Sequence, residues 1–220
     1  MTKIEAARQE YADWCQAIGI GTLQALNEAL DAGKAIPLIN LCEARQERKY
    51  AELADQIFWN RKRCRIVMMS GPSSSGKTSS SLRIAQQSRV IGLNPKVIEL
   101  DNYFVNREDT PLDENGEKDY EALGAMDIAF LNAQLNDLLD GKEIEVPKFD
   151  FVEGKRCFTG QTLKLEENDL LFMEGIHALN PALTPEIDQS KIFRIYISAL
   201  SSLPGGEKVH NSTTDKRLMR

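Results

Sequence analysis

Hydrophobic positions divide the chain into two parts with different periods. Up to about residue 62 the apolar side chains recur at helical spacing, and no convincing strand is present. Gly33 is a stop signal there, and Pro37 is expected in the connection that follows it. From Arg65 onward short apolar runs alternate with helical segments, which favours a parallel sheet with crossovers. In the first part, helices are predicted at residues 4–18, 22–32 and 43–61.

The second part predicts an α/β core that is interrupted by an antiparallel excursion. Between residues 143 and 165, extended stretches are broken by Gly154 and Gly160, which is typical of strands inserted between crossover units. We therefore expect two regions, a helical region at 1–62 and an α/β domain at 63–220. Core strands are predicted at 66–69, 96–100, 170–173 and 192–197, helices at 79–91 and 127–139, and excursion strands at 144–146, 149–151 and 162–165.

Residues 71–78 read Gly-Pro-Ser-Ser-Ser-Gly-Lys-Thr, a complete G-x-x-x-x-G-K-[ST] phosphate loop between a predicted strand and a predicted helix. Its glycines allow backbone N–H groups to turn toward a phosphate. Lys77 is expected on the β- and γ-phosphates, and the Thr78 hydroxyl on Mg²⁺. A Ser/Gly-rich loop that fits by chance is the alternative, and the flanking elements argue against it. The expected fold is that of a kinase-type P-loop NTPase, with nucleotide-binding residues Gly71, Pro72, Ser73, Ser74, Ser75, Gly76, Lys77, Thr78 and Ser79.

Two acidic residues follow predicted core strands. Asp101 and Glu174 each end an apolar run, and in open α/β sheets ligands collect at the carboxyl ends of the strands. One acid is expected to hold Mg²⁺, directly or through water, and the other to accept a proton from an attacking hydroxyl. An acid after a strand can equally be an N-cap or a solvated turn residue. A second acid downstream of a phosphate loop makes the catalytic interpretation the better one.

Composition, net charge and cysteine spacing indicate which classes of protein the chain can belong to. The chain has 220 residues, with 42% hydrophobic and 27% charged residues, as in a soluble globular protein. Its net charge of −6 gives no overall attraction for nucleic acid or an anionic membrane. Scattered cysteines disfavour a zinc site, and the charged N-terminus without an apolar core leads us to expect a cytoplasmic protein. The charged run at 43–49 is read as a solvated helical face, with RNA binding as the alternative.

Five segments in a fixed order resemble the phosphoribulokinase/uridine kinase family, and most closely its bacterial uridine kinase-like members. The resemblance covers about residues 63–220 and implies transfer of the γ-phosphoryl group of ATP, with Mg²⁺, to a hydroxyl, which is the 5′-hydroxyl in the nucleoside kinases. The segments are the phosphate loop, Asp101-Asn102-Tyr103-Phe104, Pro147-Lys148-Phe149-Asp150-Phe151, Glu174-Gly175-Ile176-His177 and Thr214-Asp215-Lys216-Arg217-Leu218-Met219-Arg220.

The resemblance also implies roles for individual residues. Asp101 matches the family's proposed base and Glu174 the acid near the metal. Tyr103 would help to enclose the acceptor, and Phe149 and Arg156 would lie on the acceptor side. Tyr120 and Glu121 match a segment that stacks on the substrate and contacts ribose hydroxyls. Arg217 and Arg220 match the start of a mobile lid whose cations stabilise the transferring phosphoryl group.

The chain departs from the uridine kinase pattern at the positions that contact the pyrimidine. Phe149 replaces a tyrosine, and Gly154 lies close to where a histidine would fall, so an acceptor other than uridine stays open. The sequence ends at Arg220, before most of the lid, and such a form should bind ATP but transfer phosphoryl slowly. His177 is placed at the head of a helix, where a structural hydrogen bond is favoured over chemistry.

An ATP-binding regulatory or sensor module without efficient phosphoryl transfer is the alternative to a kinase. A GTPase and a transporter ATPase are disfavoured, because the sequence contains neither an N-K-x-D segment after the phosphate loop nor an L-S-G-G-Q-type segment. The N-terminal helices are expected to serve packing or homo-oligomerisation. The expected partner is a nucleoside-like small molecule, with no nucleic acid and no membrane.

Overall fold

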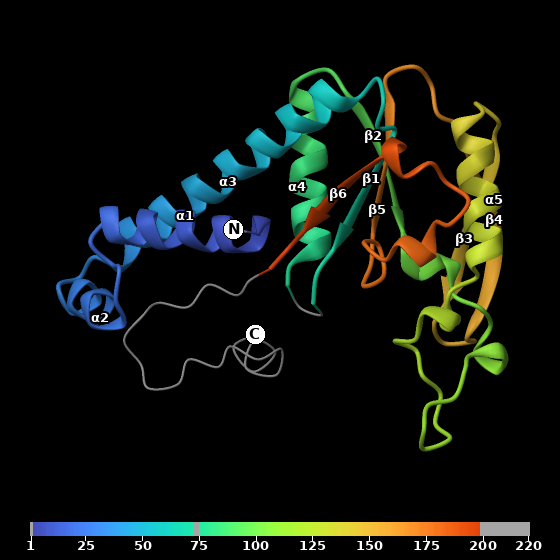
Figure 1. Cartoon of the computed structure of the whole chain (residues 1–220), viewed down its shortest axis with the longest axis horizontal. Coiled ribbons are helices and arrows are strands. Elements are labelled where there is room, and N and C mark those ends of the chain that lie inside the picture. Colours follow the sequence, from blue (N-terminus) through green and yellow to red (C-terminus); the bar gives the residue numbers. More distant parts are fainter. Residues whose placement is uncertain (1, 73–74, 199–220) are drawn as a thin grey trace. The chain divides into compact units, whose positions relative to one another are not determined.

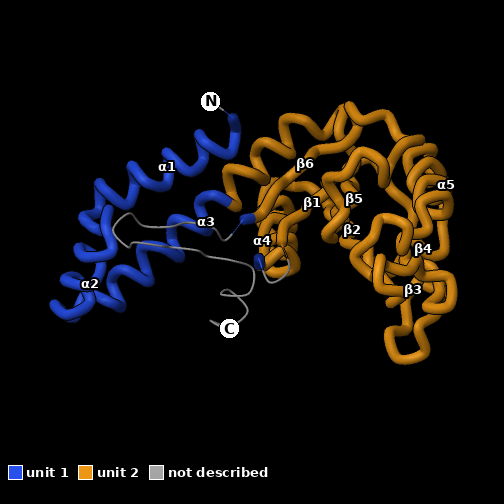
Figure 2. The backbone as a smooth tube through the Cα atoms, turned by 60° about the horizontal axis from the view of Figure 1, so that its bottom comes forward, with its two compact units in different colours: residues 1–49, 73–75, 198–220 blue, residues 50–72, 76–197 orange. Residues whose placement is uncertain are grey.

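The computed structural model describes residues 2–72 and 75–198, and its contacts divide the chain into two compact units. Of the described residues, 2–49, 75 and 198 belong to the first unit, and 50–72 and 76–197 to the second (Figure 2). The division into a helical region at 1–62 and a kinase domain at 63–220 stays a prediction.

The first unit is helical, as the apolar spacing predicts. It contains α1 (Lys3–Ala17), α2 (Leu23–Asp31) and the first part of α3 (Ala35–Asn60). Thr2 and Glu5 form a capping box at the start of α1, since each side chain bonds the backbone N–H of the other residue.

The predicted start of the third helix was wrong. Residue 43 lies well inside α3, which begins at Ala35, and Pro37 lies in its first turn and not in a connection. Backbone N–H groups of a first helical turn have no partner within the helix, so a proline there removes no hydrogen bond.

A parallel sheet flanked by helices forms the second unit, which confirms the predicted α/β fold (Figure 1). The strands lie in the order β2-β5-β1-β6. Helix α4 (Lys77–Val90) and the C-terminal turns of α3 pack on one face, while α5 (Ile128–Leu139) packs on the other. The four strands are β1 (Ile66–Ser70), β2 (Asn94–Glu99), β5 (Asp169–Glu174) and β6 (Ile192–Tyr196).

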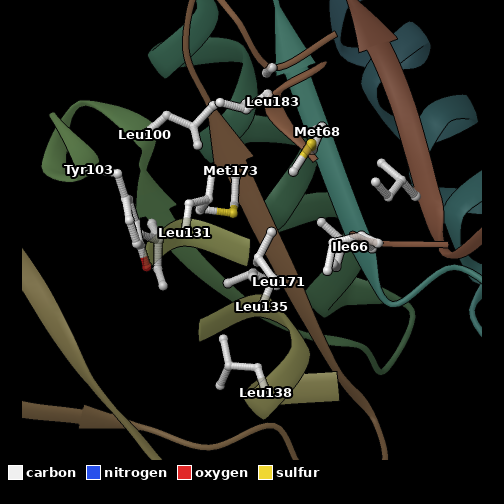
Figure 3. Packing of buried hydrophobic residues seen from close by; sticks show 14 of the residues in the cluster. Ile66, Met68, Leu100, Tyr103, Leu131, Leu135, Leu138, Leu171, Met173 and Leu183 are labelled. Carbon is white, nitrogen blue, oxygen red and sulfur yellow. The ribbon is translucent and has the colours of Figure 1, made fainter. Parts of the chain in front are cut away.

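Successive residues of the central strand β1 supply two separate cores. Val67 and Met69 pack with Ile84 of α4, whereas Ile66 and Met68 face the layer of α5. This alternation follows from the two-residue period of a strand, and both faces are buried because helices cover both. Figure 3 shows the second core, in which Ile66, Met68, Leu171 and Met173 of the sheet meet Leu100, Tyr103, Leu131, Leu135, Leu138 and Leu183.

The predicted antiparallel excursion is present as a two-stranded hairpin. Its strands are β3 (Ile144–Asp150) and β4 (Lys155–Leu163), and Phe149 pairs with Arg156. The tip turns at Gly154, whose φ of +69° is accessible to glycine at low cost.

The helix predicted to begin at His177 is not formed by the described residues there, so this prediction was wrong. Residues 175–179 form turns, and only the three-residue 3₁₀ helix Pro181–Leu183 follows. Asn180 caps that short helix through a bond from the Ala182 N–H, and Pro185 cannot continue it. The other 3₁₀ helices are Leu100–Tyr103, Arg107–Asp109, Leu123–Ala125 and Gln189–Lys191.

Candidate active site

The carboxyl ends of three neighbouring strands meet at one edge of the sheet. In the strand register, Glu174 of β5 lies between Met69 of β1 and Glu99 of β2. The phosphate loop follows β1, and Asp101 follows β2. Loop and acids are thus brought together by parallel pairing.

The described part of the phosphate loop adopts the geometry of a helix N-terminus. Gly76 is the N-cap of α4, with φ +86°, a value at which a side chain would be strained. The Lys77 ammonium donates to the Pro72 carbonyl across the loop at 3.1 Å. Gly71 is buried at the end of β1, while Ser79 is exposed in the first turn of α4. Ser73 and Ser74 lie outside the described residues, and Ser75 belongs to the first unit.

Thr78 and Glu174 lie in direct contact at the sheet edge. The Thr78 hydroxyl donates to Glu174 Oε1 at 2.6 Å, and the Glu174 side chain is buried. One neutral and one anionic oxygen side by side fit the preference of Mg²⁺ for hard oxygen ligands. Among the described residues, no group of three or more His, Cys, Asp or Glu side chains could hold a metal. A Mg²⁺ ion would therefore need further oxygens, such as those of phosphates and water.

The negative charge of Glu174 also acts on Asp101. The pKa of Asp101 is raised above the ordinary value, first because neighbouring protein atoms desolvate the carboxylate, and then because Glu174 and Glu99 carry the same charge. Lys77 and His177 act on this pKa in the opposite direction. Asp101 is nevertheless solvent-exposed, so a ligand can reach its carboxylate.

The turn after Glu174 is held close to the end of β2. A Cβ on Gly175 would lie 2.9 Å from Leu100 Cβ, so only glycine permits this approach. The Ser70 hydroxyl donates to the Ile176 carbonyl at 2.7 Å, which ties the same turn to β1. These two contacts fix the spacing of the three strand ends.

His177 lies in this turn, and its Nε2 atom is buried without a hydrogen-bond partner among the described residues. The structural hydrogen bond that the sequence favours is therefore not formed at Nε2. Instead, the imidazole contributes to the electrostatics of Asp101. The sequence signal for this proximity to Asp101 was that His177 follows Glu174, the acid at the end of β5, by three residues.

Two residues expected on the acceptor side are buried in the apolar core. Tyr103 packs beside Phe130, and its hydroxyl donates to Gln134 Oε1 at 2.9 Å. Phe149 contacts Phe104 and Phe151 edge-on, and its backbone N–H donates to Asn102 Oδ1 at 3.1 Å. In this structure both side chains are buried, and a direct contact with an acceptor stays a prediction.

Arg156 anchors the hairpin to α5. Both of its terminal nitrogens lie 2.9 Å from Asp127 Oδ2, and one also donates to the Phe104 carbonyl at 3.0 Å. Asp127 is the N-cap of α5 and accepts the Phe130 N–H through its other oxygen. Sequence reasoning placed Asp127 at the start of a helix but missed this pair. Its opposite charge to Arg156 was the available signal.

The remaining predicted residues are spread more widely. Tyr120 and Glu121 are exposed in the loop between residues 104 and 126, where Asp119 Oδ1 accepts the Glu121 N–H at 2.9 Å. Arg217 and Arg220 lie outside the described residues. No helix among the described residues has the length and apolar character to cross a membrane.

Strand, phosphate loop, helix and strand-end carboxylates together define a P-loop fold of the kinase type. The model of the phosphoribulokinase/uridine kinase family matches residues 66–213, and the chain belongs to this family. The matched residues contain four of the five segments that carry the resemblance, and the fifth, residues 214–220, lies beyond them.

Curated relatives support the family membership. A protein named uridine kinase from Ligilactobacillus salivarius (strain UCC118) is 34% identical over 128 residues, 58% of each chain. Another from Limosilactobacillus reuteri (strain DSM 20016) is 31% identical over 132 residues, 60% of this chain and 59% of the relative. The chain thus spans less than two thirds of the length of these relatives.

Among solved structures, one described as a possible uridine kinase from Bacillus stearothermophilus aligns with a TM-score of 0.49 at 23% identity. The alignment covers 66% of this chain and 80% of that one.

Proposed function

We propose that this protein is an ATP- and Mg²⁺-dependent phosphotransferase that moves the γ-phosphoryl group of ATP to a hydroxyl of a small molecule. The observation that carries the proposal is the contact of Thr78 with Glu174 at the strand ends, beside the phosphate loop and coupled to Asp101. The proposed nucleotide site, the proposed metal ligands and the candidate base all lie at the carboxyl ends of the strands, which supports the proposal.

Each of these groups has a chemical task in the proposed reaction. The N–H groups at the start of α4 and the Lys77 ammonium bind the β- and γ-phosphates, which orients the γ-phosphorus toward the acceptor. When bound, Mg²⁺ neutralises charge on the phosphate oxygens, with Thr78 and Glu174 as its protein ligands. Lys77 stabilises the negative charge that develops on the leaving β-phosphate.

Asp101 is the proposed general base. The acceptor hydroxyl forms a bond to the γ-phosphorus while the bond to the bridging oxygen breaks, its proton passes to the Asp101 carboxylate, and ADP leaves. A raised pKa brings the proton affinity of this carboxylate closer to working pH, which strengthens it as a base.

A nucleoside is the proposed acceptor, with its 5′-hydroxyl as the nucleophile. The support is the family membership together with relatives that are named uridine kinases. Because Gly154 and Phe149 depart from the pyrimidine-contacting pattern, the test must include nucleosides other than uridine.

The proposal is tested by acceptor-dependent ADP release. The protein is incubated with ATP, Mg²⁺ and a panel of nucleosides and small alcohols, with Lys77→Met as the inactive control. At least one acceptor should raise ADP release far above the rate without acceptor. ATP binding with no active acceptor would overturn the proposal in favour of a nucleotide sensor.

A further inference from the structure

A pocket of about 280 Å³ lies away from the phosphate loop, between the tip of the β3–β4 hairpin and the loop that precedes α5. It belongs entirely to the second unit, and neither the Thr78–Glu174 pair nor Asp101 lines it. Its volume suits a small group and not a whole nucleotide. The lining residues are Asn106, Arg107, Glu108, Lys118, Glu153, Gly154 and Lys155.

The pocket wall carries more cations than anions. The lining includes three cationic residues, Arg107, Lys118 and Lys155, and two carboxylates, those of Glu108 and Glu153, in a protein whose net charge is −6. Among the described residues, the bonds of these cations go to backbone carbonyls, Arg107 to Phe151 at 2.6 Å and Lys118 to Glu108 at 2.7 Å. Carbonyl oxygens hold the side chains in place but do not neutralise their charge.

Gly154 brings Arg107 against the hairpin tip. A Cβ at this position would lie 2.6 Å from Arg107 Nε, and the Arg107 N–H donates to the Gly154 carbonyl at 2.7 Å. The guanidinium therefore occupies the space of a side chain that the hairpin lacks. Backbone and side-chain bonds together fix it at the pocket wall before any ligand arrives.

Asn106 adds a donor of fixed orientation. Its Oδ1 accepts the Arg156 N–H at 3.2 Å, so its amide NH₂ group is left for other partners. The pocket thus combines a guanidinium, two ammonium groups and an amide donor.

We propose that this pocket binds a compact anionic group, the phosphate or carboxylate of a small molecule. Guanidinium and ammonium groups form charge-assisted hydrogen bonds with both kinds of oxyanion. The group belongs either to the acceptor or to a separate effector, and these two sources share the same chemistry. Because Gly154 lies close to a position that the family resemblance places at the pyrimidine, the acceptor source rests on the proposed function, whereas the effector source does not.

The test uses inorganic phosphate at constant ionic strength, followed by the backbone amide NMR signals of Gly154 and Gly76. Saturable movement of the Gly154 signal is expected, and the Gly76 signal reports separately on phosphate at the nucleotide loop. Lys155→Gln removes one ammonium group for which no hydrogen bond is found among the described residues, so binding should weaken about two- to fivefold. The double variant Lys118→Gln/Lys155→Gln should weaken it about tenfold.

Lys148→Gln is the matched control, because Lys148 is an exposed lysine of the same hairpin that does not line the pocket. It should bind phosphate at the pocket as the unmodified protein does. A Gly154 signal that never saturates, or equal affinities in the double variant and the control, would overturn the proposal.

A kinetic arm separates the two sources. If the anionic group is carried by the acceptor, inorganic phosphate competes with the acceptor and Lys155→Gln raises the acceptor KM at unchanged ATP KM. Binding of phosphate without such competition assigns the pocket to a separate effector. Failure of ATP to move the Gly76 signal would count against the proposed function and leave the pocket proposal standing.

Discussion

The edge of the parallel sheet and the hairpin region are built by different means. At the sheet edge, Glu174 is positioned by strand pairing on both sides, and its partner Thr78 lies in the first turn of a helix. In the hairpin region, side chains such as Arg156 and Asn102 bridge segments that are far apart in sequence. Backbone pairing therefore positions the proposed phosphoryl-transfer groups, while side-chain bonds hold the hairpin against its neighbouring segments.

This difference indicates which part of the molecule can change its acceptor specificity by substitution. The hydrogen bonds of a sheet join backbone groups and do not depend on the side chains. The positions of the strand ends should therefore change little when side chains are substituted. A wall that depends on a few side chains can be altered by a few substitutions. The predictions below test this contrast; the two consequences of replacing Asp101 come first, and the other substitutions follow in order of decreasing expected effect.

Replacing Asp101 by Asn should lower kcat about 10²- to 10⁴-fold, because the amide cannot accept the proton of the acceptor. ATP affinity should stay nearly unchanged, which titration calorimetry can measure. Turnover within twofold of the unmodified protein would exclude Asp101 as the base.

The same substitution should raise the melting temperature. The pKa of Asp101 is higher in the folded protein than the ordinary value, so the native state binds more protons than the unfolded state above about pH 4. Stability is consequently lost as the pH rises through the folded pKa, and Asn removes that loss at pH 7. Because Asp101 is exposed, we expect a gain of less than about 1 kcal/mol. A lower melting temperature would contradict this account.

Replacing Arg156 by Lys should destabilise the second unit by about 2 kcal/mol, since an ammonium cannot bond Asp127 and the Phe104 carbonyl from a planar fork. Urea denaturation measures the loss. Asp127→Asn is the comparison variant, because it keeps the N-cap acceptor for α5 but turns an NH₂ group toward Arg156, so it should lose at least as much through the same ion pair. Equal stability of the Lys variant and the unmodified protein would show that the anchor contributes little.

Replacing Gly175 by Ala should cost on the order of 1–2 kcal/mol, because the new Cβ would lie 2.9 Å from Leu100 Cβ. The displaced Leu100 precedes Asp101, so kcat should also fall. Gly124→Ala is the control, with its nearest neighbour, Pro111 Cγ, at 3.5 Å. Similar stability and kcat for both variants would remove the proposed spacing role of Gly175.

The smallest effect is expected at Glu99. Its charge raises the pKa of Asp101, so Glu99→Gln should lower that pKa and move the acid limb of the kcat/KM profile to lower pH. His177 lowers the same pKa, and His177→Gln should move the limb to higher pH or leave it in place. Shifts of the opposite signs would contradict the electrostatic coupling.

Sequence alone predicted most of the sheet and its edge. The apolar run at 66–69 and the octet at 71–78 are local patterns, and parallel topology then brings Asp101 and Glu174 to the same side. By contrast, the start of α3 was missed because a proline is compatible with a first helical turn. The helix at His177 was wrong because Pro181 and Pro185 restrict the chain there to turns and one short 3₁₀ helix.

Contacts between side chains that are far apart in the sequence could not be predicted either. Nothing in the local pattern shows that Arg156 reaches Asp127, or that Tyr103 turns its hydroxyl toward Gln134 in the core. Such pairs depend on the three-dimensional approach of segments, and period and propensity carry no information on it. The same holds for the position of Arg107 against Gly154.

The hairpin and α5 both depend on the side chain of Asp127. One carboxylate oxygen holds the first turn of the helix and the other holds the arginine of β4. Loss of this single side chain would release two elements at once, so fraying of the helix and detachment of the hairpin should occur as one cooperative event.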